Sequence, residues 1–112
     1  MDGEEDSLRT LLQILAEPRR RYALYHLRRR DRTTVTRIAD NVAGWMAAGR
    51  DEPLSAETLV RIYTDLHHTD LPKLAAADIV DYRGDERVEV TRFPDVLHAL
   101  LDVTLEFDDG AT

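Results

Sequence analysis

The sequence predicts a mainly α domain with a small β-hairpin, an α+β fold, because the spacing of its apolar residues changes along the chain. Before residue 70, apolar residues recur every three or four positions in several segments, which is typical of amphipathic helices. From Asp70 to Thr91 (DLPKLAAADIVDYRGDERVEVT), a helical stretch leads into an apolar run, a turn at Gly84 and Asp85, and an alternating strand. The expected strand residues are Ile79, Val80, Tyr82, Val88 and Val90.

Length and composition indicate one domain. The chain has 112 residues, which is enough for one compact core and little else. Residues 1–6 are acidic and are expected to be disordered, and the acidic residues 106–112 are expected to fray. Residues 7–105 between them form a single predicted domain, which includes a C-terminal helix from about residue 94.

Three amphipathic helices are expected before residue 50. Ser7 can cap the first, Pro18 fits the first turn of the second, and Thr33 or Thr34 can cap the third. Trp45 lies at the edge of the third apolar stripe, where a core role is favoured over a ligand pocket. The apolar sides consist of Leu8, Leu11, Leu12, Ile14 and Leu15; Tyr22, Ala23, Tyr25 and Leu27; and Val35, Ile38, Ala39, Val42 and Met46.

A fourth helix is expected after the polar linker 49–53. Ser55 can cap it, and Leu54 can pack on Leu59 as a hydrophobic staple. Pro72 disfavours a regular helix nearby, so the segment 69–73 either kinks or breaks, with Thr69 or Asp70 capping a second segment. The predicted buried stripe is Leu59, Ile62, Tyr63 and Leu66, and the opposite, outward side carries Glu57, Arg61, Thr64 and His68.

The charged residues are unusual in number and in type. Acidic residues number 22 against 15 Lys and Arg, which gives a net charge of −7, and Lys73 is the only lysine. Such an acidic, lysine-poor composition resembles that of proteins from salt-loving archaea, which work in concentrated potassium chloride. The alternative is an ordinary acidic protein from a GC-rich genome, where arginine codons displace lysine. We favour the high-salt interpretation.

The sequence offers little support for catalysis, metal binding or membrane insertion. It has no cysteine, no glycine-rich phosphate loop and no nucleophile motif, so we expect no enzyme and no cofactor. His26 and His98 are isolated, while His67 and His68 point in different directions on a helix, so no metal site is expected. No apolar run approaches the roughly 18 residues that span a bilayer, and no basic, apolar leader is present; a cytoplasmic protein is expected.

The order of these elements resembles the winged helix-turn-helix regulators of the ArsR and MarR type. The matching segments are LLQILAEPRRRYALYHL, TVTRIADNV and LPKLAAADIVDYRGDERVEVT. EPRRRYALYHL followed by DLPKLAAADIVDY also resembles a family of small, uncharacterised winged-helix domains that are common in halophilic archaea. The resemblance covers about Leu8 to Thr91. It implies a winged-helix fold, binding of double-stranded DNA and transcriptional regulation.

In such a fold, the helix before the hairpin enters the major groove and the hairpin, or wing, touches the DNA backbone. By position, Arg61 is the candidate for reading a base, with Thr64 and His68 beside it, and Arg83 and Arg87 are candidates for holding phosphate. The alternative is an ordinary solvated helix face. The corresponding alternative function is a winged-helix module that has lost DNA binding and docks on a protein partner.

The arginine clusters and the end helices suggest further roles. Arg19, Arg20 and Arg21 oppose the dipole at the start of a helix, so they need acidic partners or bound phosphate. Arg28, Arg29 and Arg30 lie at the favourable end, and ion pairing is the favoured role for both clusters. The first helix and the helix after Pro94 have broader apolar arcs than one core requires, which favours a homodimer through these helices over simple capping of the core.

Overall fold

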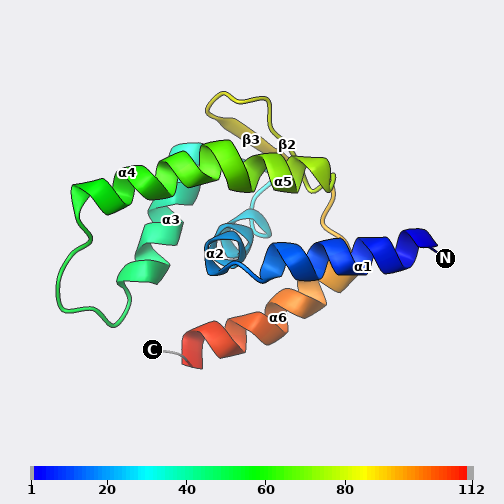
Figure 1. Ribbon diagram of the computed structural model, residues 1–112, viewed down its shortest axis with the longest axis horizontal. Coiled ribbons are helices and arrows are strands. Elements are labelled where there is room, and N and C mark those ends of the chain that lie inside the picture. Colours follow the sequence, from blue (N-terminus) through cyan, green and yellow to red (C-terminus); the bar gives the residue numbers. More distant parts are fainter. Residues whose placement is uncertain (1, 111–112) are drawn as a thin grey trace.

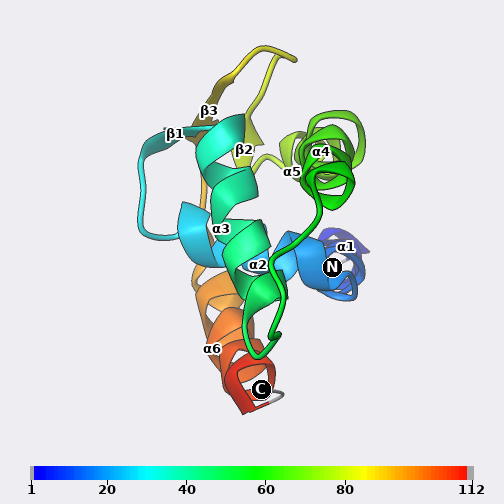
Figure 2. The same cartoon turned by 90° about the vertical axis from the view of Figure 1, so that its left-hand side faces the viewer.

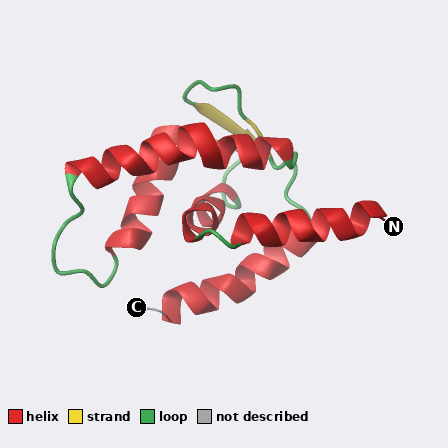
Figure 3. Cartoon of the chain, viewed as in Figure 1, coloured by secondary structure: helices red, strands yellow, loops and turns green. Residues whose placement is uncertain are grey.

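The computed structural model describes residues 2–110 and confirms the α+β class, with helices predominating over one small sheet (Figure 3). The helices are α1 (Asp2–Leu15), α2 (Pro18–Leu27), α3 (Val35–Ala47), α4 (Ala56–Asp65), α5 (Leu71–Ala76) and α6 (Asp95–Gly110). A π-helical turn, η1 (Leu66–Asp70), joins α4 to α5. The strands are β1 (Arg32–Thr34), β2 (Val80–Asp81) and β3 (Arg87–Val90).

The three strands form an antiparallel sheet in the order β1-β3-β2. The predicted hairpin is present: β2 and β3 pair with Val80 opposite Val90, and Gly84 in the connecting turn has a φ of +90°, which glycine adopts without strain. Strand β1 was not expected from the sequence. It places Thr33 opposite Val88, and both residues are buried. The sheet therefore ties the segment between α2 and α3 to the hairpin.

Helix α2 lies at the centre of the molecule, where Figures 1 and 2 show it surrounded by α1, α3 and α6. Five consecutive residues, Ala23–Leu27, are buried, so the second half of this helix has no solvent-exposed side. The rest of the core consists of Leu11, Ile14, Leu15, Val35, Ile38, Val42, Ile62, Leu66, Leu71, Leu74, Ile79, Val80, Val88, Leu97 and Leu101. Trp45 packs against this core half-buried, and its ring stacks on Tyr22 with centroids 5.3 Å apart.

The helix caps predicted from the sequence are present at the starts of α3 and α4. The Thr34 hydroxyl accepts the backbone N–H of Arg37 at 3.1 Å, and the Ser55 hydroxyl accepts that of Thr58 at 3.1 Å. Helix α1 differs, because it begins at Asp2 and Ser7 lies inside it. The structure describes residues 2–6 as the first residues of α1, where the sequence analysis expects disorder. Met1 lies outside the described residues.

The C-terminal end is also more ordered than expected. Helix α6 continues to Gly110, whereas the sequence analysis expects fraying from residue 106; residues 111–112 lie outside the described part. Asp108 explains the difference, because its side chain is buried and accepts two hydrogen bonds from Arg21, at 2.9 and 3.0 Å. These bonds attach the last turns of α6 to α2.

Pro72 does not interrupt the helical segment, and Figure 1 shows α4 and α5 following one another in a single rod. In η1 the N–H of Leu71 reaches back five residues to the carbonyl of Leu66. Pro72 then occupies the first turn of α5, where its missing N–H costs little. Neither Thr69, which is exposed, nor Asp70, whose side chain makes no capping bond, begins a new helix.

Only half of the predicted stripe on α4 is buried. Ile62 and Leu66 face the core, whereas Leu59 is 45% exposed and Tyr63 is 37% exposed. The prediction that Leu59 and Tyr63 are core residues is wrong. The rest of the protein covers only the part of the apolar stripe that carries Ile62 and Leu66. Leu8, Leu12 and Met46 are likewise exposed, although they belong to predicted apolar sides.

Candidate functional site

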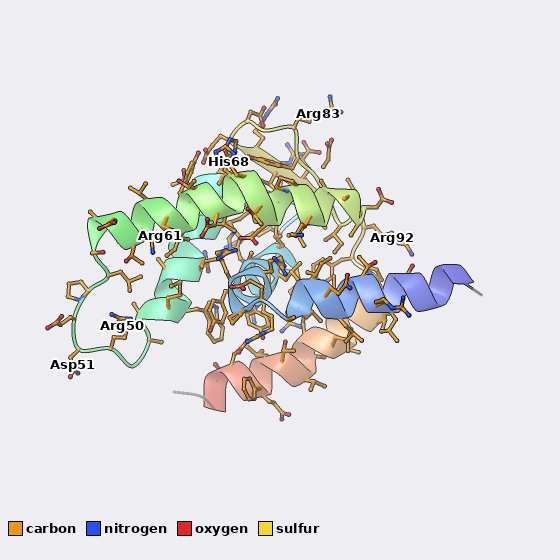
Figure 4. All side chains as sticks on the ribbon, viewed as in Figure 1. Arg50, Asp51, Arg61, His68, Arg83 and Arg92 are labelled. Atoms are coloured by element: carbon orange, nitrogen blue, oxygen red, sulfur yellow. The ribbon has the colours of Figure 1, made fainter. Side chains whose placement is uncertain are left out.

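The outward face of α4 carries the residues that the sequence singled out. Because Ile62 and Leu66 are buried, helical geometry turns Thr64 to the opposite side, with Arg61 beside it. Arg61, Thr64 and His68 are all exposed, as expected. Figure 4 shows His68 toward the hairpin and Arg61 toward the other edge of the helix. The α4 face consists of Glu57, Val60, Arg61 and Thr64 from α4, together with His68 from the adjoining η1.

The hairpin is fastened to this helix by side chains. The Tyr63 hydroxyl donates to a carboxylate oxygen of Glu86 at 2.7 Å, and His67 forms a hydrogen bond with the Tyr82 hydroxyl. The other Glu86 oxygen accepts the backbone N–H of Thr36 at 2.6 Å, at the start of α3. Glu86 therefore connects the hairpin to two helices, and Tyr63 and His67 hold the hairpin against the helix that carries the α4 face.

The pKa values in this connection follow from its hydrogen bonds. The bond from Thr36 and, after it, the bond from Tyr63 favour the ionised carboxylate and lower the pKa of Glu86, against an opposing effect of burial. The same bond raises the pKa of Tyr63, because the phenol must keep its proton to donate to Glu86. The connection is therefore formed by a carboxylate and a neutral phenol at neutral pH.

Arg83 and Arg87 project from the hairpin, and each side chain is 84% exposed. Arg83 lies 3.4 Å from Asp81, and Arg87 lies 3.7 Å from Asp85. On the α4 face, Arg61 approaches Glu57 at 3.8 Å. Such exposed pairs contribute little free energy, so these guanidinium groups can exchange their carboxylates for another anion.

The surface as a whole carries more carboxylates than arginines. Asp81, Asp85, Glu86 and Glu89 surround the two hairpin arginines. At low ionic strength this arrangement would weaken any attraction to phosphate. In about 1 M salt, however, the Debye length falls to about 3 Å, and only groups in direct contact affect each other strongly.

Two residues of this surface were not identified from the sequence. Val60 is 65% exposed beside Thr64, and apolar residues are usually assigned to the core when a sequence is interpreted. Arg37 is exposed in the first turn of α3, next in the chain to Thr36, which bonds Glu86, and it forms no ion pair with the described residues. The only available signal for Arg37 was its place three residues after the capping Thr34.

The first arginine cluster is internal to the fold. Arg19 and Arg20 both bind Asp70, which is completely buried, and Arg21 binds Asp108. Arg28 from the second cluster pairs with Asp102 at 2.8 Å. The favoured interpretation as ion pairs is confirmed for these four residues. None of them belongs to the α4 face or to the hairpin.

The described residues contain no group of three or more His, Asp or Glu side chains placed to hold a metal ion. Within the same residues, no helix combines the length and the apolar character that crossing a bilayer requires. The α4 face and the hairpin expose guanidinium, hydroxyl, imidazole and methyl groups.

Comparison with known proteins gives one result. The profile of a family described as "Domain of unknown function (DUF7344)" matches residues 12–90, from within α1 to the end of β3. No curated protein matches the chain, and no solved structure matches it. The matched segment includes the α4 face and the hairpin and covers more than half of the sequence. The chain therefore belongs to the DUF7344 family of domains.

Proposed function

We propose that this protein is a winged helix-turn-helix regulator that binds double-stranded DNA as a homodimer in a high-salt cytoplasm. The observation that carries the proposal is the element order α2-β1-α3-α4-β2-β3 with the sheet order β1-β3-β2. In a winged helix, α3 and α4 correspond to the helix-turn-helix and the β2–β3 hairpin to the wing. The exposed α4 face next to the hairpin agrees with this assignment.

In the proposed complex, the α4 face enters the major groove. Arg61 leaves its weak pair with Glu57 and donates two hydrogen bonds to a guanine, while Thr64 and His68 contact neighbouring bases. Arg83 and Arg87 hold phosphates on one side of the helix, and the free Arg37 adds a third phosphate contact. Recognition then depends on direct contacts, which persist in molar salt, and not on a broad basic surface.

The dimer is proposed through α1 and α6, which Figure 1 shows on the side of the molecule away from the hairpin. Leu8, Leu12, Val96, Val103 and Phe107 remain between 43% and 70% exposed there. Burying these side chains against a second copy would stabilise a two-fold dimer and leave both α4 faces free. Such a dimer suits a palindromic site.

The test measures duplex binding in molar potassium chloride. A random duplex library is selected with the full-length protein, and the affinity of the enriched duplex is measured by fluorescence anisotropy. Arg61→Ala is expected to weaken binding by about 1–3 kcal/mol and to relax the sequence preference. Arg92→Ala is the matched control, because Arg92 is also exposed but lies at the base of the hairpin, far along the molecule from Arg61 (Figure 4). Failure to enrich any duplex at any salt concentration would reject DNA binding.

The competing candidate is a winged-helix module that docks on another protein. The exposed apolar side chains Leu59, Val60 and Tyr63 on α4 and the acidic hairpin favour it. It predicts that the wild-type protein binds no duplex, whereas the proposed function requires one. The same selection experiment therefore separates the two candidates.

A further inference from the structure

Val60 is an exposed apolar residue for which the fold gives no reason. Its side chain is 65% exposed in the middle of a helix, where it buries little apolar surface. A β-branched residue also has a lower helix propensity than Ala, Glu, Lys or Arg, so valine is a poor choice for helix stability at such a position. The residue therefore adds to neither the core nor the helix.

The neighbours of Val60 describe the surface that it belongs to. On the helix surface, Val60 and Thr64 are one turn apart and adjacent, and Arg61 lies on the other side of Thr64. Leu59 and Tyr63 lie further round toward the hairpin, where the Tyr63 hydroxyl is held by Glu86. Val60 thus lies at a boundary on the helix, with the partly exposed Leu59 and Tyr63 on one side and Thr64 and the candidate base-reading Arg61 on the other.

Resting on the proposed function, we infer that Val60 reads the 5-methyl group of a thymine next to the guanine bound by Arg61. In the major groove, thymine differs from cytosine by a carbonyl oxygen and this methyl group, which is recognised by apolar contact. The Val60 methyl groups supply that contact, and the Thr64 methyl group extends it along the helix. Residues 60 and 64 are about 6 Å apart along the axis, which corresponds to about two base pairs.

A protein partner fits Val60 less well than a base does. The core of a protein interface has few charged residues, whereas Thr64, Glu57 and Arg61 lie on one side of Val60, opposite the partly exposed Leu59 and Tyr63. An apolar contact from Val60 beside the hydrogen-bonding Thr64 and Arg61 matches the edge of a thymine beside a guanine. The inferred half-site therefore contains a thymine within two base pairs of the guanine that Arg61 reads.

The experiment removes this methyl group without changing any hydrogen bond. In the duplex selected with the wild-type protein, each thymine is replaced singly by deoxyuridine, and the dissociation constants are measured in molar potassium chloride. One thymine in each half-site is expected to give about fourfold weaker binding when replaced, which is the effect of losing one buried methyl contact. Val60→Ala is expected to bind the thymine and deoxyuridine duplexes equally, and Val60→Ile to restore the difference.

Val103→Ala is the matched control, because Val103 is 66% exposed on α6, away from α4. It is expected to leave the ratio of the two dissociation constants unchanged even if it weakens the dimer. If the wild-type protein binds every deoxyuridine duplex as tightly as the thymine duplex, the inference is overturned while DNA binding is left intact. A thymine preference that is unchanged in Val60→Ala would also overturn the inference. If no duplex is enriched in the selection, the proposed function itself fails and the inference fails with it.

Discussion

Asp70 is a completely buried carboxylate that joins three parts of the chain. It lies in η1 and accepts hydrogen bonds from Arg19 at 3.1 Å and from Arg20 at 3.3 Å. Arg20 in turn donates to the carbonyls of Ile14 and Gln13 at the end of α1. These arginines oppose the dipole at the start of α2, but they lie at the negative end of α1 and beside a buried anion. Their position is therefore favourable overall.

Removing the Asp70 carboxylate should be strongly destabilising. Asp70→Ala leaves two partly buried guanidinium groups without their partner, which is expected to cost about 3 kcal/mol of unfolding free energy. Asp102→Ala is the matched control, because it breaks the Arg28 pair at a carboxylate whose side chain is 72% exposed. The control should cost less than about 1 kcal/mol. Urea denaturation measures both, and equal losses would contradict the assignment.

His26 gives the stability a pH dependence with a definite sign. It is buried, and its Nε2 lies 2.8 Å from the Thr33 hydroxyl. Burial, together with Arg30 and Arg37, lowers its pKa in the folded state below the reference value of 6.5. As the pH decreases through 6.5, the unfolded chain therefore binds a proton before the folded chain does. The stability that neutral His26 contributes is complete above this pH and is lost below it.

The corresponding variant is His26→Gln, which can keep the hydrogen bond to Thr33 but does not titrate. Between about pH 7.5 and 5.5, the free energy of unfolding of the wild-type protein should fall more steeply than that of His26→Gln. Thermal or urea unfolding at several pH values, at constant salt, gives the two slopes. Identical slopes would show that His26 does not titrate differently in the folded and unfolded states.

Among the elements, the hairpin depends on α4 for its position. The contacts are the Tyr63 hydroxyl with Glu86 and His67 with Tyr82. Tyr63→Phe removes the first and leaves the ring in place. Because Tyr63 is on the surface, the melting temperature should change little, while amide hydrogen exchange in β3 and the hairpin turn should become faster. Unchanged exchange would show that the hairpin is held by the sheet alone.

The sequence predicted the elements that have a periodic pattern of their own. The helices and the hairpin could be recognised because each has an apolar side. Strand β1 could not, because its three residues, RTT, are polar and form a strand only by pairing with β3. The π turn did leave a signal, since Leu66 and Leu71 are both buried and five residues apart, one more than an α-helical turn accommodates.

For the candidate site, local geometry was predictable and tertiary packing was not. The outward direction of Arg61, Thr64 and His68 follows from the positions of Ile62 and Leu66 on one helix. The exposure of Leu59 and Tyr63 depends on how narrow the contact of α4 with the rest of the protein is. The role of Asp70 depends on arginines 50 residues away in the sequence, which no local pattern reveals.

At the scale of the whole molecule, the proposed DNA-binding surface and the proposed dimer surface are on different sides. Phe107 and Val103 on α6 are 70% and 66% exposed. Phe107→Asp should abolish a dimer, because it would bury a charge in an apolar interface. Val60→Asp is the matched control, at a site of similar exposure (65%) outside α1 and α6. Light scattering at high protein and salt concentration measures the mass, and a wild-type monomer would contradict the dimer.

The stack of Tyr22 on Trp45 makes the protein its own optical probe. Trp45 is the only tryptophan in the chain. It belongs to α3, and the centroid of its ring lies 5.3 Å from that of Tyr22 and 5.1 Å from that of Tyr25, both on α2. Its fluorescence therefore reports whether these two helices are in contact, without any label. Trp45 faces neither the hairpin nor the outward side of α4. A change in its emission on adding a ligand would therefore indicate that the interior rearranges. A constant emission would indicate that the protein binds as a rigid body.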